Sequence, residues 1–341
     1  MSLGTFKRFG LQFPLCQPNK SATDDFSIIE LGEHMNLLNV TRTFTTEDQA
    51  LDYLIEQRWP NGVRCLACDH DKVYAIATVG KTGKPCRLFE CGECKLHFSA
   101  TTGTLFHDSH LPLTKWFMAM ALMTEAKKGI SANQIARHIG VQYKTAWYLC
   151  HRIRKAMQEL SEPLGGQGQV VEIDETYLGG RKQNHRKTTK EIKDRKIKVF
   201  GMVERGGRVR LQRVENLKAE TLRQLYQQNV SPNAGKVFTD GSPTYHFVVP
   251  KDKHVATNHE QELRDTGTVT NKTIEGAFSL FKRGLVGSYH KLSQDHLDSY
   301  LGEFCWRYNR RKMQPWMFQT LLRELVTKKP LTYRHLTREV F

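Results

Sequence analysis

Two pairs of cysteines in the N-terminal third of the chain have the spacing of metal ligands: Cys65 and Cys68, then Cys91 and Cys94. Each CxxC pair supplies two thiolates from one tight turn, and four thiolates satisfy the tetrahedral coordination of Zn²⁺. The intervening segment VYAIATVGKTGKPCRLFE reads as a β-hairpin, so the pattern predicts a zinc ribbon over residues 46–105 with one structural Zn²⁺. Four unligated thiols are the alternative interpretation, and Cys86 is a rival fourth ligand.

The chain carries an excess of basic residues. Lys and Arg total 51 against 35 Asp and Glu among 341 residues, which gives a formal net charge of +16. This surplus favours a polyanionic partner, because cations that neutralise phosphates release counterions from nucleic acid. No stretch approaches the ~18 apolar residues of a membrane span, and the first residues lack the apolar core of a signal peptide. We therefore expect a cytoplasmic, nucleic-acid-binding protein whose 8 cysteines are metal ligands or reduced thiols.

A helix-turn-helix pattern follows, within an expected DNA-binding domain over residues 106–164. In SANQIARHIGVQYKTAWYLCHRIRKAM, apolar residues face inward on a first helix, Gly140 makes the turn, and a second helix follows. The start of the second helix in such units enters the major groove of DNA. Residues 126–158 include seven Lys or Arg and no acid, although an ordinary αα-hairpin with a basic face would look similar. The candidate DNA contacts are Gln142, Tyr143, Lys144 and Thr145.

Three acidic residues indicate a catalytic metal site. Asp174 follows the β-branched run VVEI, Asp240 follows VFT, and Glu275 opens an amphipathic helix. Carboxylates brought together from two strand ends and one helix can hold a pair of Mg²⁺ ions, for which Mn²⁺ can substitute. Two such ions clamp the attacking and leaving oxygens of an in-line phosphoryl transfer. The alternative is that each acid is a helix cap, a turn residue or a surface charge.

Further charged residues flank these acids. Lys282 lies seven residues after Glu275, close to two helical turns, so both project from one helix face. A phosphate-contacting cation beside a metal-binding carboxylate fits a nuclease site, so Lys282 is a candidate catalytic residue and its neighbour Arg283 a candidate DNA contact. Glu175 is expected at the mouth of the site. Residues 181–198 include nine Lys or Arg against two acids, which predicts a DNA-gripping loop or, in the alternative, a solvated one. The candidate DNA contacts in this loop are Arg181, Lys182, Arg186 and Lys187.

The remaining segments set the expected domain boundaries. Residues 1–45 show no sustained periodicity and are predicted to be a flexible arm, and residues 313–341 are assigned to a C-terminal tail. Thr46 and the acids after it predict a short helix. The glycine-rich linker at 165–168 opens a catalytic domain over residues 165–312, in which strands alternate with helices.

In this order, the motifs resemble those of DDE/K-type bacterial insertion-sequence transposases of the subgroup with an N-terminal zinc ribbon. Asp174, Asp240 and Glu275, with Lys282, look like the DDE/K signature, and the 35-residue separation of the last two acids is typical of these enzymes. The matching segments are RWPNGVRCLAC, CGECKLHFSATTGTLFHDSHLPLTKW, EIDETYLGG, TIEGAFSLFKRGLVGSYH and YLGEFCWRYNRR.

The resemblance implies an α/β catalytic domain with an RNase H-like fold, in which helices flank a mixed sheet. It implies Mg²⁺-dependent cleavage of DNA 3′ ends followed by strand transfer, at the bacterial nucleoid. The partners it implies are double-stranded DNA, as terminal inverted repeats and target, and a second copy of the chain in a homodimer. Family members often carry an Asn three residues before the Glu, which some are thought to use as the third metal ligand. Asn271 is four residues before Glu275, which favours Glu275 as the ligand.

Two other classes of protein stay open. An RNase H-like junction nuclease would share the acids but would need neither a helix-turn-helix nor a sequence preference. A zinc-ribbon transcription regulator without catalysis would share the DNA-binding units, but three intact acids argue against it. Binding to one inverted repeat, as against any branched DNA, would separate these readings.

Overall fold

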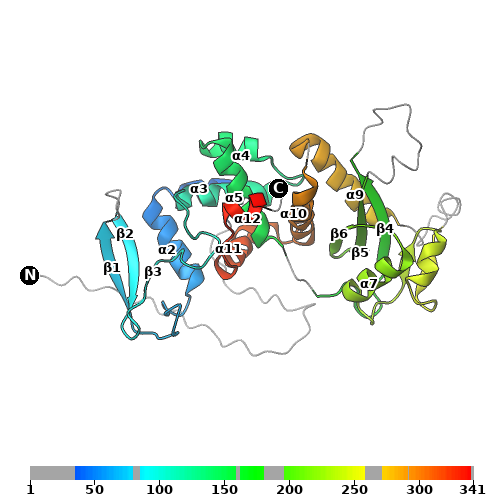
Figure 1. The fold of residues 1–341 in the computed structure, drawn as a ribbon, viewed down its shortest axis with the longest axis horizontal. Coiled ribbons are helices and arrows are strands. Elements are labelled where there is room, and N and C mark those ends of the chain that lie inside the picture. The colour runs from blue at the N-terminus through cyan, green and yellow to red at the C-terminus, as the bar shows by residue number, and fades with distance from the viewer. Residues whose placement is uncertain are drawn as a thin grey trace, which may run out of the picture. The chain divides into compact units, whose positions relative to one another are not determined.

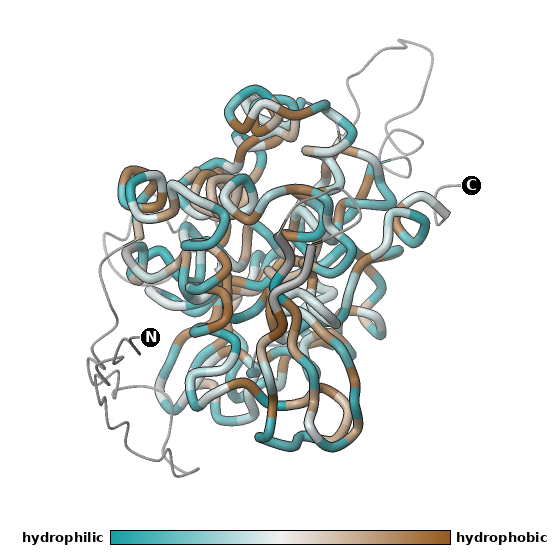
Figure 2. The backbone as a smooth tube through the Cα atoms, turned by 90° about the vertical axis from the view of Figure 1, so that its left-hand side faces the viewer, coloured by the Kyte–Doolittle hydropathy of each residue, from teal (hydrophilic) through white to brown (hydrophobic). Residues whose placement is uncertain are grey.

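Figure 1 shows the fold of the chain as a computed structural model. The structure describes residues 35–79, 85–158, 162–179, 196–257, 271–290 and 292–338. Within these ranges no helix is both long and apolar enough to cross a membrane. Polar and apolar residues are interleaved along the helices instead, as the hydropathy colouring of Figure 2 shows.

Helices from both ends of the described chain share one hydrophobic core. They are α1 (Leu37–Thr43), α2 (Glu47–Arg58), α3 (Leu113–Glu125), α4 (Ala132–Ile139), α5 (Tyr143–Ala156) and α11 (Met317–Thr327). Most of α3 is buried, with Trp116, Phe117 and Met120 fully enclosed. Removal of this apolar surface from water is the main term that stabilises the helical core.

The short helix predicted after Thr46 is confirmed as α2. The Thr46 hydroxyl accepts a hydrogen bond from the backbone N–H of Gln49 (3.3 Å), and the Gln49 side chain accepts one from the Thr46 backbone (3.0 Å). This capping box satisfies two amide groups that a helix start leaves open. Ala50 and Leu54 of α2 are fully buried in the helical core. The helical core therefore takes in the first part of the range assigned to the zinc ribbon.

The flexible arm predicted over residues 1–45 is wrong for its last part. Residues 37–43 form α1, Val40 and Phe44 are buried, and the Phe44 ring meets the Phe117 ring edge-on at 4.8 Å. Two buried side chains, one on the helix and one at its C-cap, leave little periodic signal in so short a segment, but α3 gives them a surface to pack against. Residues 1–34 lie outside the described residues.

The C-terminal tail predicted from residue 313 is also wrong. Helix α11 buries Phe318, Leu321 and Leu325 in the helical core, and the Leu325 carbonyl accepts a hydrogen bond from the backbone N–H of Leu105 (3.0 Å). A further helix, α12 (Tyr333–Arg338), follows it. The end of the described chain therefore returns to complete the N-terminal core.

The zinc ribbon is a three-stranded sheet. Strand β1 (Val73–Val79) pairs antiparallel with β2 (Pro85–Cys91), which pairs antiparallel with β3 (His97–Phe98). The predicted hairpin between the cysteine pairs is therefore confirmed. Its own hydrophobic cluster is small and centres on Phe89 and Phe98, with Trp59 packed against both rings.

A five-stranded mixed sheet has the order β6-β5-β4-β7-β8. The strands are β4 (Val171–Leu178), β5 (Ile197–Glu204), β6 (Val209–Val214), β7 (Val237–Thr239) and β8 (His254–Ala256). The first three in sequence pair antiparallel, whereas β7 is parallel to β4 and β8 is parallel to β7. Gly206 adopts a left-handed φ of 77° in the tight turn that joins β5 and β6 as a hairpin.

Helices cover both faces of this sheet. On one face, Phe200 and Met202 pack with Leu222 of α7 (Ala219–Asn229). On the other, the apolar stripes of α9 (Lys272–Gly284) and α10 (Leu297–Asn309) pack against Val199 and Val203. A Cβ added at Gly201 of β5 would lie 2.5 Å from the Phe278 ring, so this glycine lets α9 approach the sheet closely.

A buried ion cluster joins the helical core to the sheet domain. Glu303 of α10 is fully buried and accepts hydrogen bonds from Arg154 of α5 (2.6 Å), Tyr289 (2.8 Å) and Arg307. Burial raises the pKa of Glu303, but Arg307 and Arg154 outweigh this and hold it below its usual range. Tyr289 ends η2 (Leu285–Tyr289), which directly continues α9. One carboxylate thus ties α5 to α10 and to the end of α9.

Candidate functional site

Asp174 and Asp240 lie side by side where β7 ends. Strand β4 pairs with β7 only through Val171 and Glu172, the latter opposite Phe238. Two residues further along the same register, Asp174 comes level with Asp240, which directly follows β7. The expectation that Asp174 ends its own strand is wrong, since β4 continues to Leu178. The continuation is held by β5, which pairs with β4 over its whole length.

A third carboxylate joins this pair. Asp174, Glu175 and Asp240 each offer an oxygen that lies within 4.8 Å of the other two. Glu175 is fixed by the hydroxyl of Tyr245, a buried residue of η1 (Pro243–Phe247), which donates a hydrogen bond to its carboxylate. We call these three residues the acid cluster. The sequence indicates Glu175 only at the mouth of the site, and it does not indicate Tyr245, because no periodic pattern marks that tyrosine.

Glu275 faces the same cavity but is outside the acid cluster. A pocket of about 520 Å³ is lined by Asp174, Thr176, Glu275, Phe278, Ser279, Lys282, Arg283 and Val286. Helix α9 therefore brings Glu275 and two cations to the side of Asp174, as the helical spacing predicted. Asn271, the rival ligand, is buried at the N-cap of α9, where its backbone carbonyl accepts a hydrogen bond from the backbone N–H of Glu275 (3.1 Å).

Burial and mutual repulsion favour the protonated forms of Asp174 and Glu175 when no cation is bound. Burial raises the pKa of Asp174 to about 7, the carboxylates of Glu175, Asp240 and Glu275 add to the rise, and the Glu175 backbone N–H opposes it. Burial also raises the pKa of Glu175, against the hydrogen bond from Tyr245. Clustered hard oxygen donors of this kind fit a divalent cation such as Mg²⁺, which would take the place of the protons.

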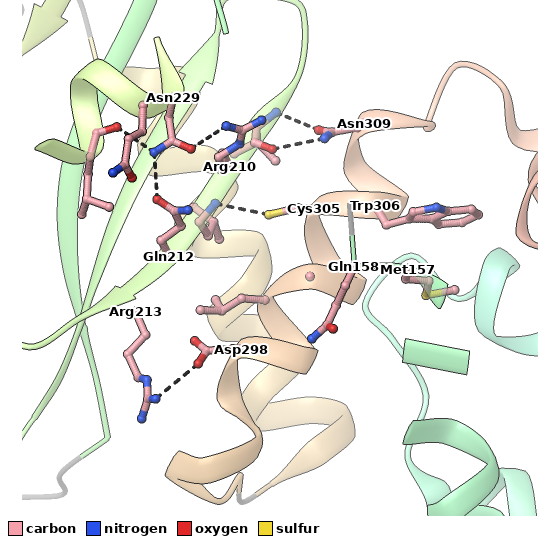
Figure 3. A pocket seen from close by; sticks show the side chains of 16 residues that line it. Met157, Gln158, Arg210, Gln212, Arg213, Asn229, Asp298, Cys305, Trp306 and Asn309 are labelled. Atoms are coloured by element: carbon pink, nitrogen blue, oxygen red, sulfur yellow. Dashed lines mark hydrogen bonds and ion pairs between the residues drawn. The ribbon is translucent and has the colours of Figure 1, made fainter. Parts of the chain in front are cut away.

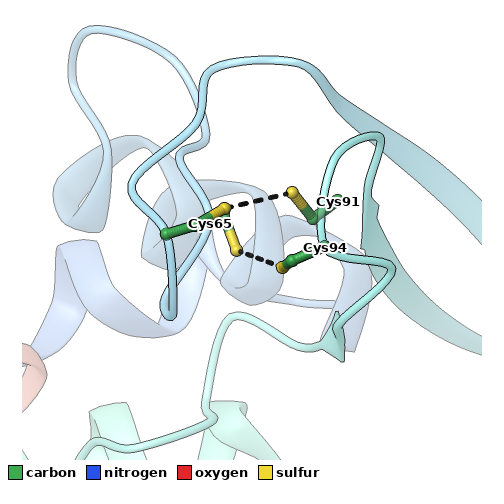
Figure 4. Close-up of side chains that lie close together, drawn as sticks. Cys65, Cys91 and Cys94 are labelled. Atoms are coloured by element: carbon green, nitrogen blue, oxygen red, sulfur yellow. Dashed lines mark hydrogen bonds between the residues drawn. The ribbon is translucent and has the colours of Figure 1, made fainter.

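The four predicted zinc ligands converge. Their sulfur atoms all lie within 4.8 Å of one another. Figure 4 shows the side chains of Cys65, Cys91 and Cys94 pointing toward one another. Cys65 Sγ is 3.4 Å from Cys94 Sγ, and Cys68 Sγ is 3.6 Å from Cys91 Sγ. Zn–S bonds of about 2.3 Å in a tetrahedron require sulfur separations close to these. The cysteines thus fit a structural Zn²⁺, while the side chain of the rival Cys86 lies outside the described residues.

Backbone amides prepare one of the thiols for metal. Hydrogen bonds from the backbone N–H groups of Cys68 and Ala67 lower the pKa of the Cys65 thiol to about 6. Burial opposes this effect, and the Cys94 and Cys68 thiols add to it. A thiol with a lowered pKa is more readily the thiolate that binds Zn²⁺.

Helices α4 and α5 are joined by a tight turn at Gly140, whose φ of 61° is left-handed. The four residues predicted to contact DNA, Gln142 to Thr145, are all exposed around the start of α5. The ammonium of Lys144 lies 4.8 Å from the centre of the Tyr333 ring. The Tyr148 hydroxyl donates a hydrogen bond to the Leu331 carbonyl (2.5 Å). The segment after Pro330, to which sequence analysis gave no role, therefore packs beside the predicted DNA contacts.

The four basic loop residues, Arg181, Lys182, Arg186 and Lys187, lie outside the described residues. The DNA-gripping loop over 181–198 therefore stays a prediction. Arg283 is described, exposed on α9, and lines the same pocket as Asp174.

A larger pocket, of about 640 Å³, lies away from the acid cluster. It lies between β6, α7 and α10 (Figure 3). Its polar side chains bind one another: the Asn229 amide donates to Gln212 (3.1 Å) and its carbonyl oxygen accepts from Arg210 (2.5 Å). Arg213 pairs with Asp298 (3.3 Å). These groups already have partners, so the smaller pocket beside the acids is the candidate functional site.

Two segments of the chain match known families. Residues 163–309, which include the acid cluster and Glu275, match the family model described as an ISXO2-like transposase domain. Residues 45–97, which include the four converging cysteines, match the model described as a transposase zinc-ribbon domain. A protein of the transposable element ISH50 of Halobacterium salinarum is 28% identical over 283 residues, which cover 77% of this chain and 91% of that protein.

Proposed function

We propose that this chain, which carries a transposase domain and an N-terminal transposase zinc-ribbon domain, is the transposase of an insertion sequence: it binds the terminal inverted repeats of its element, cleaves DNA 3′ ends and joins them to target DNA. The observation that carries the proposal is the acid cluster at the end of β7, beside a pocket that also holds Glu275 and two cations. Clustered carboxylates repel one another and destabilise the fold unless a bound cation neutralises them, so such a cluster indicates a functional site.

Each side chain of this site has a role in the proposed reaction. Mg²⁺, when bound, would supply Lewis acidity and align the attacking and leaving oxygens. Asp174 and Asp240 would hold it between two strands, and Glu275 would complete the site from α9. Glu175, fixed by Tyr245, would add negative charge at the edge. Lys282 and Arg283 would bind phosphate groups of the DNA strand that enters the pocket.

The sheet order supports an RNase H-like assignment for the catalytic domain, which we propose over residues 165–312. Three antiparallel strands are followed by two parallel ones, and the first strand in sequence lies in the middle. In open α/β sheets, sites form beyond the carboxyl ends of parallel strands, next to the strand at which the order reverses. That position is the one at which β4 and β7 carry their acids.

The exposed start of α5 supports the proposal that α4 and α5 form a helix-turn-helix that reads the inverted repeats. We further propose that two copies of the chain act together, because each element has two ends to cut. The mass of the protein bound to a pair of repeat duplexes tests this, with two chains per complex as the expected result.

A cleavage assay tests the function as a whole. Zinc-loaded protein with Mg²⁺ should cut duplexes taken from the DNA that flanks its coding sequence, at one position, and join the freed 3′ ends to a second duplex. Equal cleavage of any branched DNA would instead favour a junction nuclease. Sequence-specific binding without cleavage would favour a transcription regulator.

Replacement of Glu275 by Gln is expected to lower the cleavage rate by at least about 10²-fold, because loss of a metal ligand should exceed the 10–100-fold effect of its supporting groups. Asn271→Ala should keep most of the activity. Both variants are compared with Mg²⁺ and Mn²⁺, after thermal unfolding has verified that each is folded. Robust cleavage by Glu275→Gln together with an inactive Asn271→Ala would assign the third ligand to the asparagine.

Lys144→Ala is expected to weaken binding to repeat DNA and to reduce the slope of log affinity against log salt concentration by about 1, as one phosphate contact is lost. Titrations at several salt concentrations measure both quantities. Lys155→Ala is the matched control, since this exposed lysine lies in the last turn of the same helix. Equal effects of the two variants would show that the start of α5 is not the reading surface.

A further inference from the structure

A fourth acid, Glu172, lies on β4 two residues before Asp174. Side chains two apart on a strand point to the same face, so both acids face the same side of the sheet. Glu172 is 0% exposed, whereas Asp174 is only partly buried. A fully buried carboxylate is costly unless hydrogen bonds or opposite charge compensate its lost hydration.

The compensation for Glu172 comes from the first turn of α9. One of its oxygens accepts the backbone N–H groups of Thr273 (2.8 Å) and Ile274 (3.0 Å). The other accepts the Thr273 hydroxyl (2.8 Å) and the Arg205 side chain (2.9 Å). Asn271, which occupies the N-cap, makes no capping bond with its side chain. A strand residue therefore caps this helix, and its negative charge suits the positive end of the helix dipole.

This cap links the strand that carries Asp174 to the helix that carries Glu275, two of the proposed metal ligands. Ile274 is the residue before Glu275, so the amide bonds fix the backbone from which that side chain projects. Asp174 is held on the same strand as the cap, two residues away. The bonds of one carboxylate thus tie the start of α9 to β4, and together with the apolar packing of α9 they set the separation of the Asp174 and Glu275 backbones. Arg205, which packs over the Phe238 ring at 4.8 Å, anchors that carboxylate from the end of β5.

We infer that Glu172 is a positioning residue, which sets Glu275 of α9 against Asp174 of β4 and so determines how tightly the site binds a divalent cation. The inference rests on the proposed function, in which these acids hold Mg²⁺. Glutamine at this position would be a poor substitute, because its amide NH₂ would face N–H or O–H donors whichever way it turned.

The competing explanation is that Glu172 only stabilises the fold. Glu204 provides the matched control, since it is also a buried acid of this sheet, 6% exposed, with backbone and arginine partners. It accepts the Gly165 backbone N–H (2.8 Å) and the Arg208 guanidinium (2.8 Å), neither of which belongs to α9. Replacement of either glutamate by Gln should lower the melting temperature, but only Glu172→Gln should disturb the metal site.

Mn²⁺ binding to zinc-loaded protein without DNA tests the inference independently of catalysis, with electron paramagnetic resonance as the readout. Glu172→Gln is expected to weaken Mn²⁺ affinity about 10–100-fold, the range for groups that orient metal ligands. Amide hydrogen exchange at residues 273–276 should become faster in the same variant. Glu204→Gln should leave both quantities as in the wild type.

Unchanged Mn²⁺ affinity in a folded Glu172→Gln variant would overturn this inference but not the proposed function. An equal loss of Mn²⁺ affinity in Glu204→Gln would do the same. A wild-type protein that binds no Mn²⁺ at these acids would overturn the proposed function as well. If Glu172→Gln does not fold, Thr273→Val removes only one bond to the carboxylate, and a several-fold loss of Mn²⁺ affinity is expected. Wild-type affinity in that variant would then count against the positioning role.

Discussion

Asp174→Asn is expected to abolish DNA cleavage and strand transfer while it stabilises the metal-free protein. Asp174 is the one acid that belongs both to the acid cluster and to the pocket that Glu275 faces. Loss of a group that only orients a metal ligand lowers activity about 10–100-fold. Loss of the Asp174 carboxylate itself should therefore lower the cleavage rate by more than about 10²-fold. Binding to repeat DNA should be retained, because α5 is a separate surface. Gel-based cleavage and binding assays measure the two properties on one preparation.

The stability change has a definite dependence on pH. The pKa of Asp174 is raised from 3.8 to about 7, so its protonated form favours the fold. The stabilisation by the protonated form is fully present below about pH 4 and is lost as the pH rises through about 7. The size of the pKa shift limits this loss of unfolding free energy to about 4 kcal/mol. Asparagine is neutral at every pH. The unfolding free energy of the wild type should therefore fall between pH 5 and pH 8 more steeply than that of Asp174→Asn.

Denaturant unfolding in Mg²⁺-free buffer measures this difference, and no chelator is added because it would remove the structural zinc. Asp252→Asn, which changes an exposed acid, is the control and should follow the wild-type pH dependence. Added Mg²⁺ should stabilise the wild type at pH 8 and leave Asp174→Asn unaffected. Parallel pH curves for the wild type and Asp174→Asn would mean that the acid cluster carries no such strain.

Cys65→Ser is expected to unfold the zinc ribbon. The hydrophobic cluster of this module is small, with Phe89 and Phe98 at its centre. Structural Zn²⁺ contributes roughly 10–16 kcal/mol of binding free energy in modules of this kind, and that free energy is also folding free energy. Zinc content should fall from one ion per chain to none, and amide exchange over residues 63–98 should become fast. Unfolding should stop at α2, because Ala50 and Leu54 belong to the helical core.

Cys150→Ser is the matched control for this experiment. Cys150 is buried in α5, away from the other thiols, and burial raises its pKa to about 12, which suits an inert thiol. This variant should keep one zinc per chain and a protected zinc ribbon. A full zinc complement in Cys65→Ser would show that another group takes the fourth position, with Cys86 the first to be tested.

The sequence by itself determined the features that depend on short-range patterns. The two CxxC pairs predicted the zinc ribbon, because two ligands from each tight turn need little information beyond their spacing. Thr46 and the acids after it predicted a helix start, and Gly140 predicted the turn that ends a helix, because caps and turns depend on local hydrogen bonds and backbone geometry. The spacing of Glu275 and Lys282 predicted their common helix face, and β-branched runs before Asp174 and Asp240 predicted their strands.

Only the tertiary structure decided which distant segments meet. Helices α1 and α11 lie at opposite ends of the described chain and share one core, because each has an apolar face too small to be stable alone. The hydrogen bond from Tyr245 that fixes Glu175, and the cap that Glu172 places on α9, join residues far apart in sequence. Such contacts follow from sheet register and helix packing, which bring specific atoms within hydrogen-bond distance. A periodic pattern specifies which side of an element is buried, but it does not specify what lies opposite.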